Sequence, residues 1–254
     1  MLFRSANFEQ GRNFFETETG EVNAADFIDK EGHGTHVSGT IAASYNAKTG
    51  FTGVAPKAKI LMGRVCGKEG CSNIAISEGI NWGIEQHVDV ISMSLGGPVG
   101  SLTHETAVKN AEAAGVVVVA ASGNDGTGQV SFPAAYNDVY AVGAIDINLK
   151  KTSFSQWGPE LDIVAPGSAV ISSVPRGSGR DSIVNISYPG IKREIKSAAF
   201  SGTKLVSKAV TKQLVVAGLG KPEDFSKIKV KGKFALISRG EIKFSEKVKN
   251  ATVI

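Results

Sequence analysis

Short apolar runs alternate with amphipathic segments between about residues 33 and 144 of the chain. The apolar runs are rich in Val, Ile and Ala, and the segments between them repeat apolar positions at helical spacing. This alternation is typical of a parallel β-sheet whose strands are joined by helices of about 10 to 15 residues. The predicted strands span residues 59–65, 88–93, 116–121 and 139–144, and the predicted helices span residues 33–44, 74–85 and 102–114.

The flanks of this pattern are less regular. Residues 1–32 contain several carboxylates but no apolar run, so we expect a solvated loop there. Residues 162–165 and 170–173 lie on either side of Pro166-Gly167, and we expect them to form a hairpin-like corner. Together these segments predict an α/β fold with a doubly wound parallel sheet, in which helices cover both faces. Ligands of such sheets bind at the carboxyl ends of the strands.

Composition and charge allow a globular protein of more than one domain. The chain has 254 residues, of which 42% are hydrophobic and 20% are charged. Its 28 basic and 24 acidic residues give a net charge of +4, and the basic excess lies mostly after residue 185. We expect a solvated lysine-rich surface there and no nucleic-acid partner, because no aromatic residues interleave the lysines. No stretch approaches the roughly 20 apolar residues of a membrane span, and no signal peptide opens the chain.

A histidine lies in a run of small residues at the predicted start of the first helix, in the string Gly32-His33-Gly34-Thr35-His36. Small neighbours would let a nucleophile and a substrate backbone approach the His33 imidazole, and a helix start would hold it on a rigid element. The alternative is a structural histidine in a glycine turn. For His36 we favour a packing role within the helix.

Further motifs follow this string in a fixed order. With His33 to Thr40, the segments 89–97, 116–126, 131–134 and 141–144 closely resemble the subtilisin-like serine proteases, the subtilases. The resemblance covers about residues 10–175. It implies a sheet of the subtilisin type and a secreted or cell-surface endopeptidase, which hydrolyses peptide bonds of peptide or protein substrates through an Asp, His and Ser triad.

The resemblance assigns roles to individual residues. His33 matches the general base, and Asn124 matches the side-chain amide that stabilises the oxyanion, which contributes about 3 to 4 kcal/mol in subtilisin. An Asn between Gly123 and Gly126 is also typical of a left-handed turn. The remaining matches bind substrate: two pocket walls, which could also be tight loops at strand ends, and a second edge that pairs with the peptide backbone. The walls are Ser94, Leu95, Gly96 and Ala121, Ser122, Gly123, and the second edge is Gly70, Cys71, Ser72.

Two triad members have no match. The family's aspartate lies about 30 residues before the histidine on a central strand, so its absence is expected to leave two strand edges unpaired. In the string nearest to the serine motif, Lys204 would occupy the nucleophile position, and we interpret this string as a coincidental match in another domain. We therefore expect an incomplete and inactive chain. The alternatives are a pseudoprotease or peptide-binding module, or a non-functional product of a truncated gene.

The composition becomes lysine-rich near Asn185, where we expect a domain boundary between residues 1–184 and 185–254. Residues 215–225 and 230–241 are similar to the protease-associated (PA) domain, a β-rich insertion of some large subtilases. A strand at 233–238 and a helix at 243–250 are expected there, followed by an end within the domain that looks truncated.

The two cysteines and the candidate ion ligands leave alternatives open. Cys66 and Cys71 are too few for a zinc site, and either a small disulfide or two free thiols fits them. A disulfide would steady the second substrate-binding edge. Calcium is possible in the complete family member, but the loop 44–50 offers mainly Asn46 as a side-chain ligand, so we place no metal site.

Overall fold

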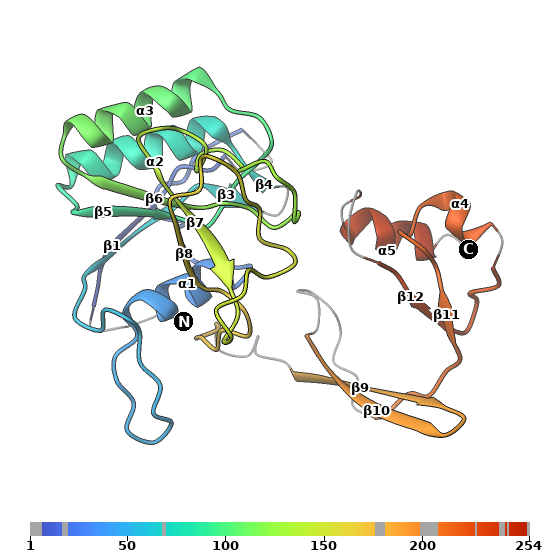
Figure 1. Cartoon of the computed structure of the whole chain (residues 1–254). Coiled ribbons are helices and arrows are strands. Elements are labelled where there is room, and N and C mark those ends of the chain that lie inside the picture. The colour runs from blue at the N-terminus through green and yellow to red at the C-terminus, as the bar shows by residue number, and fades with distance from the viewer. Residues whose placement is uncertain are drawn as a thin grey trace. The chain divides into compact units, whose positions relative to one another are not determined.

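The computed structural model describes residues 7–16, 20–67, 70–175, 181–198, 208–226, 228–238, 242 and 244–252. They belong to two compact units, Met1–Ala199 and Phe200–Ile254 (Figure 1). The predicted boundary at Asn185 lies inside strand β9 (Asp181–Tyr188), 14 residues before the end of the first unit. The assignment of the domains themselves stays a prediction.

The largest sheet of the first unit has four parallel strands in the order β5-β6-β7-β8. Three of the predicted strands are thereby confirmed, because each apolar run lies in one of these strands. The strands are β5 (Val90–Met93), β6 (Val117–Ala121), β7 (Tyr140–Ile145) and β8 (Ile163–Pro166).

Three helices of the first unit confirm the predicted ones. They are α1 (His33–Ala42), α2 (Asn73–Glu85) and α3 (Leu102–Ala113). Serine side chains cap two of them: Ser72 accepts a hydrogen bond from the amide of Ala75 in α2, and Ser101 accepts one from the amide of His104 in α3. Helices α2 and α3 lie side by side on the same side of β5 and β6 (Figure 1).

One face of the four-stranded sheet forms the main core with these helices. The side chains of β6 alternate between the two faces, as strand geometry requires. Val118 and Ala120 are buried against the helices, whereas Val117 on the opposite face is 43% exposed. Tyr140 and Ile163 lie on that same opposite face and are 54% and 51% exposed. The described helices α2 and α3 therefore bury only one face of the sheet.

Residues 8–13 form a strand, so the prediction of a solvated loop over residues 1–32 is wrong there. Strand β1 (Phe8–Asn13) pairs in parallel with β2 (Ile60–Arg64). The sequence FEQGRN gives no apolar signal of a strand, because its polar side chains are mostly exposed. Its end is nevertheless buried: Asn13 is 1% exposed and donates to the carbonyls of Phe15 and Asn23.

The parallel strands of the first unit form two separate sheets. Strand β2 pairs only with β1, and β5 pairs only with β6, within the part of the chain that the structure describes. Helix α2 packs on both pieces, because Trp82 contacts Phe14 beside β1 and Ile80 belongs to the main core. Two strand edges are therefore left without a ladder, as expected for a sheet that lacks its central strand.

The predicted hairpin-like corner at 162–173 is wrong. Strand β8 pairs in parallel with β7, and residues 170–173 form no strand. Instead, the hydroxyls of Ser172 and Ser173 donate to the carbonyls of His36 and Thr35 in α1, at 2.6 and 2.9 Å. Gly39 permits this approach, because a Cβ there would overlap Ser173. Serine hydroxyls that bind helix carbonyls, rather than strand pairing, hold this segment.

A hairpin of the first unit was not foreseen from the sequence. Strand β9 (Asp181–Tyr188) pairs antiparallel with β10 (Ile191–Ala198), and Gly190 takes a positive φ of 79° in the turn. The signals were an alternating run followed by Pro189-Gly190, which is typical of a hairpin.

The second unit contains a short parallel sheet and two helices. Strands β11 (Leu214–Val216) and β12 (Phe234–Leu236) pair with each other, and α4 (Pro222–Phe225) contacts α5 (Phe244–Thr252). The predicted strand at 233–238 and helix at 243–250 are confirmed. Lys247 is 3% exposed, and its ammonium group donates to two backbone carbonyls, those of Leu219 and Ser238.

Acid should destabilise the first unit through His104. This side chain is 3% exposed beside the Tyr136 ring, and its Nε2 has no partner among the described residues. Burial lowers the pKa of His104 below its usual 6.5. The unfolded chain therefore takes up a proton first as the pH falls below about 6.5, and the free energy of unfolding falls by up to about 1.4 kcal/mol per pH unit. Urea unfolding of the chain and of His104→Leu between pH 8 and pH 5 measures this, and an equal pH slope in both proteins would contradict it.

The half-exposed sheet face and the two unpaired strand edges should make the chain marginally stable or prone to aggregate. We expect sedimentation velocity to show self-association and thermal unfolding to be irreversible. A cooperative, reversible transition from a monomer would overturn this expectation.

Candidate active site

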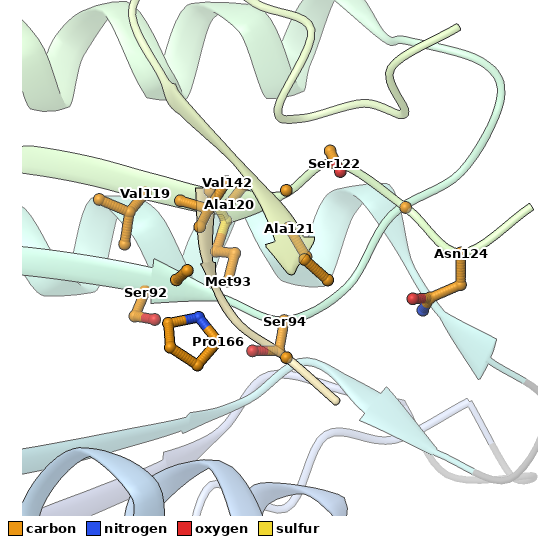
Figure 2. A pocket seen from close by; sticks show the side chains of 15 residues that line it. Ser92, Met93, Ser94, Val119, Ala120, Ala121, Ser122, Asn124, Val142 and Pro166 are labelled. Atoms are coloured by element: carbon orange, nitrogen blue, oxygen red, sulfur yellow. The ribbon is translucent and has the colours of Figure 1, made fainter. Parts of the chain in front are cut away.

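The carboxyl ends of the four-stranded sheet surround a cavity of about 340 Å³. Figure 2 shows its side chains coming from neighbouring strands, with Val119 and Asn124 at opposite ends of the group. Lining residues come from β5, β6, β7 and β8, as expected for parallel strands that end at the same edge. Five of the residues assigned from the sequence lie in this wall: Ser94, Ala121, Ser122, Gly123 and Asn124.

The other assigned residues lie outside the cavity wall. Leu95 packs against the main core, and Gly96 lies close to the backbone of Phe132. The second edge, residues 70–72, belongs to a hairpin and to the cap of α2. His33 is the first residue of α1, and its side chain is exposed.

Asn124 does not take the left-handed conformation that the alternative interpretation, a residue of a glycine turn, requires. Positive φ angles occur at Gly123 (114°) and Gly126 (68°), while Asn124 is absent from the described non-glycine residues with positive φ. The two glycines thus supply the turn. The Asn124 side chain follows strand β6 and is exposed. The turn does not depend on its side-chain amide.

A buried polar network lies beneath this turn and centres on Gln156, which is 5% exposed. Its backbone amide donates to the carbonyl of Gly123 at 3.2 Å, and its side-chain amide donates to the carbonyl of Gln129. Its Oε1 accepts from the hydroxyl of Ser131 at 3.1 Å, and its carbonyl accepts from that of Ser122 at 3.2 Å. Gly123 is required here because a Cβ would overlap the Gln156 side chain. The network therefore fixes the backbone just before Asn124.

Asp29 fixes the backbone around His33. The helix N-cap, Gly32, has a positive φ of 89° and no side chain, so Asp29 satisfies the free amides from outside the helix. Its Oδ1 accepts from the amides of Glu31 and Gly32 at 3.0 and 2.8 Å, and its Oδ2 accepts from the amide and hydroxyl of Thr35, both at 2.7 Å. Burial alone would raise the pKa of Asp29, but these hydrogen bonds together lower it below its usual 3.8.

Asp29 does not replace the missing triad aspartate. Its oxygens are occupied by the loop and by α1, and no described carboxylate forms a hydrogen bond with the imidazole of His33. Lys204, which lies in the string nearest to the serine motif, is outside the described residues. Within the described chain Asn124 lines the cavity, His33 lies outside its wall, and no carboxylate is bound to His33.

The hairpin that includes the predicted second edge contains a disulfide, so of the two possibilities for the cysteines the disulfide is the one observed. Cys66 and Cys71 are bonded and face each other across β3 (Cys66–Gly67) and β4 (Gly70–Cys71). Arg64 holds the same strand: its Nε donates to the carbonyl of Cys66, and its Nη1 donates to the carboxylate of Asp26 at 2.9 Å. Arg64 thereby joins this edge to the loop that leads to α1.

The described residues offer no further site of the kinds that the sequence left open. They contain no group of three or more histidine, cysteine or carboxylate side chains that could hold a metal ion. In the loop 44–50 the Asn46 side-chain oxygen accepts from the amide of Lys48, which is an ordinary turn contact. Within the same described ranges no helix has the length and hydropathy needed to cross a membrane.

Comparison with known proteins identifies the class. The subtilase family model matches residues 2–213, and the PA domain model matches residues 207–252. The chain belongs to the subtilase family of serine proteases, and it carries a PA domain segment after the protease segment.

Individual relatives agree with this family. The major intracellular serine protease of Bacillus subtilis is 45% identical over 172 residues, which are 65% of this chain and 53% of that protein. The intracellular serine protease of Paenibacillus polymyxa is 40% identical over 212 residues, 81% of this chain and 59% of the relative. Subtilisin Savinase of Lederbergia lenta is 49% identical over 148 residues, which are 58% of this chain and 55% of that protein. The chain thus spans little more than half the length of these relatives.

Sequence reasoning missed Asp29, Arg64 and Gln156. A weak signal existed for Asp29, since an aspartate three residues before the Gly32 start of a helix can cap it. For Gln156 the partners are 25 to 34 residues away in sequence, and no local pattern reports them.

Replacing Gln156 by alanine should destabilise the first unit by about 2 kcal/mol or more. The change leaves the hydroxyl of Ser131 and the carbonyl of Gln129 without their buried partner and opens a cavity. Urea unfolding followed by tryptophan fluorescence measures the difference. Gln129→Ala is the matched control, because the exposed Gln129 contributes only its backbone carbonyl, and it should change the stability by less than about 0.5 kcal/mol.

Replacing Asp29 by alanine should cost about 1 kcal/mol of stability through the lost cap of α1. Because the pKa of Asp29 is lowered on folding, this contribution is present above about pH 4 and disappears as the pH falls through the folded pKa. The measurement is the free energy of unfolding of Asp29→Ala at pH 7 and pH 3. The control is Glu31→Ala, which changes an exposed residue. Equal stability of the two variants at pH 7 would show that the cap is dispensable.

Proposed function

We propose that the complete protein is an endopeptidase that hydrolyses peptide bonds through a Ser, His and Asp triad. His33 is its general base and Asn124 its oxyanion donor. The carrying observation is that Ser94, Ala121, Gly123 and Asn124, which come from two separate strand ends, line one cavity. Peptide or protein substrates are the partners that the family implies.

In this mechanism the His33 imidazole takes the proton of the serine hydroxyl as the oxygen attacks the scissile carbonyl. The side-chain amide of Asn124 donates a hydrogen bond to the oxyanion that forms, and His33 then delivers its proton to the leaving amine. Residues 94–96 and 121–123 are the two walls of the pocket, and residues 70–72 pair with the peptide backbone. The network under Gly123 supports this role, because a donor must be held in place before charge develops.

The chain alone is inactive in this proposal. Within the described residues no carboxylate is bound to His33, and no string of the sequence matches the serine motif. The complete domain is a doubly wound sheet in which a further strand, which carries the aspartate, lies between β2 and β5. Support for that strand comes from the two sheet edges that have no ladder in the described chain.

A peptide-binding module without catalysis is the second candidate. The observation in its favour is that four of the residues assigned to substrate binding line one cavity, while no described carboxylate is bound to His33. A non-functional truncated product predicts neither binding nor catalysis.

Secretion or exposure at the cell surface is our proposal for the location. Two relatives are named as intracellular proteases, so family membership alone does not imply secretion. Support comes from the Cys66–Cys71 disulfide, since such bonds persist mainly in oxidising compartments.

The purified chain should neither hydrolyse a casein substrate nor react with a fluorophosphonate probe, because both require an activated serine. Mass spectrometry of the probe-treated chain measures this. A stoichiometric adduct on one serine would contradict our interpretation of the string around Lys204.

The proposal is tested by reading the coding DNA on both sides of this chain and expressing the longer protein. We expect a protease whose kcat falls about 100-fold to 1,000-fold in Asn124→Leu and further in His33→Ala. The control is His36→Ala, which should retain activity. Loss of activity with His36→Ala and retention with His33→Ala would overturn the assignment of the base.

A further inference from the structure

The hairpin that contains the second substrate-binding edge is unusually small. Strands β3 and β4 share only two residue pairs, Cys66 with Cys71 and Gly67 with Gly70. Two glycines and two cysteines bury little apolar surface, and a two-stranded hairpin on its own is marginal in water. Something other than strand pairing must hold Gly70 and Cys71 in place.

The contacts around the hairpin are unequally distributed between its strands. On β3, the Cys66 carbonyl accepts from Arg64, and the Phe15 ring lies against Gly67, where a Cβ would contact it. Gly70 and Cys71 of β4 are linked to β3 by the disulfide, and the next residue, Ser72, is held by the hydrogen bond of its amide to the Val65 carbonyl and by its place as the cap of α2. Strand β3 is thus fixed by the body of the unit, whereas between Gly70 and the anchored Ser72 the bridge is the side-chain link that holds β4 to β3.

Reductants can reach this bridge. Cys71 is exposed and Cys66 is half-buried, in contrast to the buried polar network beneath Gly123. Disulfide exchange depends on access to a sulfur, so this bridge is open to attack by a thiolate.

We propose that the Cys66–Cys71 disulfide is a redox switch of peptide binding. In the bonded state β4 is held as an edge that can pair with a peptide backbone, and reduction releases it. The reductant is a dithiol: its first thiolate attacks one sulfur and forms a mixed disulfide, and its second thiolate displaces the cysteine. The products are two cysteine thiols and the oxidised, cyclic reductant, so two electrons and two protons pass to the protein.

This switch rests on the proposed function, because it assumes that residues 70–72 pair with the substrate. Binding along a strand edge uses main-chain donors and acceptors that must point in one direction. When the edge is already ordered, the peptide does not have to order it, which improves affinity. Closure of a loop this short has a modest effect, so we expect the dissociation constant to rise about 10-fold on reduction.

The test uses the purified chain and a fluorescein-labelled, uncharged eight-residue peptide of alanine, serine and leucine. Fluorescence anisotropy gives the dissociation constant before reduction, after dithiothreitol, and after reoxidation, with thiol titration to confirm each state. We expect affinity to fall about 10-fold and to recover. The control is the double variant Cys66→Ser, Cys71→Ser, which should bind as weakly as the reduced chain and ignore dithiothreitol.

Three other outcomes are possible, and each contradicts one of these claims. Equal affinity in the two redox states overturns the switch and leaves the proposed function standing. Absence of binding in the oxidised state overturns the peptide-binding role of this edge, and with it the switch. Loss of near-ultraviolet circular dichroism from Trp82 on reduction would show general unfolding, and local control of the edge would then be wrong.

Discussion

The parallel ladder β5-β6-β7-β8 is the constraint on which the site depends. Parallel strands end at one edge, so Ser94 after β5 and Asn124 after β6 are brought to the same cavity although 30 positions separate them in the chain. Helices α2 and α3 hold this ladder from one side through an apolar core. Buried polar groups fix two of the connecting segments: Gln156 holds the turn at Gly123, and Asp29 holds the start of α1.

Much of the fold could be predicted because its signals are local. The helices at α1, α2 and α3 follow apolar positions at helical spacing, and the strands β5, β6 and β7 are apolar runs of the right length. Strand β1 could not be predicted because it is a polar edge strand, and its pairing with β2 depends on residues 50 positions away. The segment 170–173 looked like a strand, yet its serines bind the carbonyls of α1, a tertiary contact that sequence periodicity does not report.

The candidate site also combines residues with a local sequence signal and residues without one. Candidates such as His33 and Asn124 could be named from motifs, because the proposed chemistry requires those side chains at those places. The residues that hold them could not, since Gln156 is defined by partners on three other segments and Arg64 by Asp26, 38 residues earlier. A motif reports which groups react, whereas the groups that fix their geometry are chosen by the packing of the whole unit.

The half-exposed face formed by Val117, Tyr140 and Ile163 couples assembly to folding. Any polypeptide that covers this face binds the folded chain and not the unfolded one, so it raises the free energy of unfolding by mass action. The same cover would lie beside the cavity at the strand ends, because both belong to one sheet. A partner that covers this face would therefore stabilise the sheet that carries the cavity, to an extent that depends on the partner's concentration.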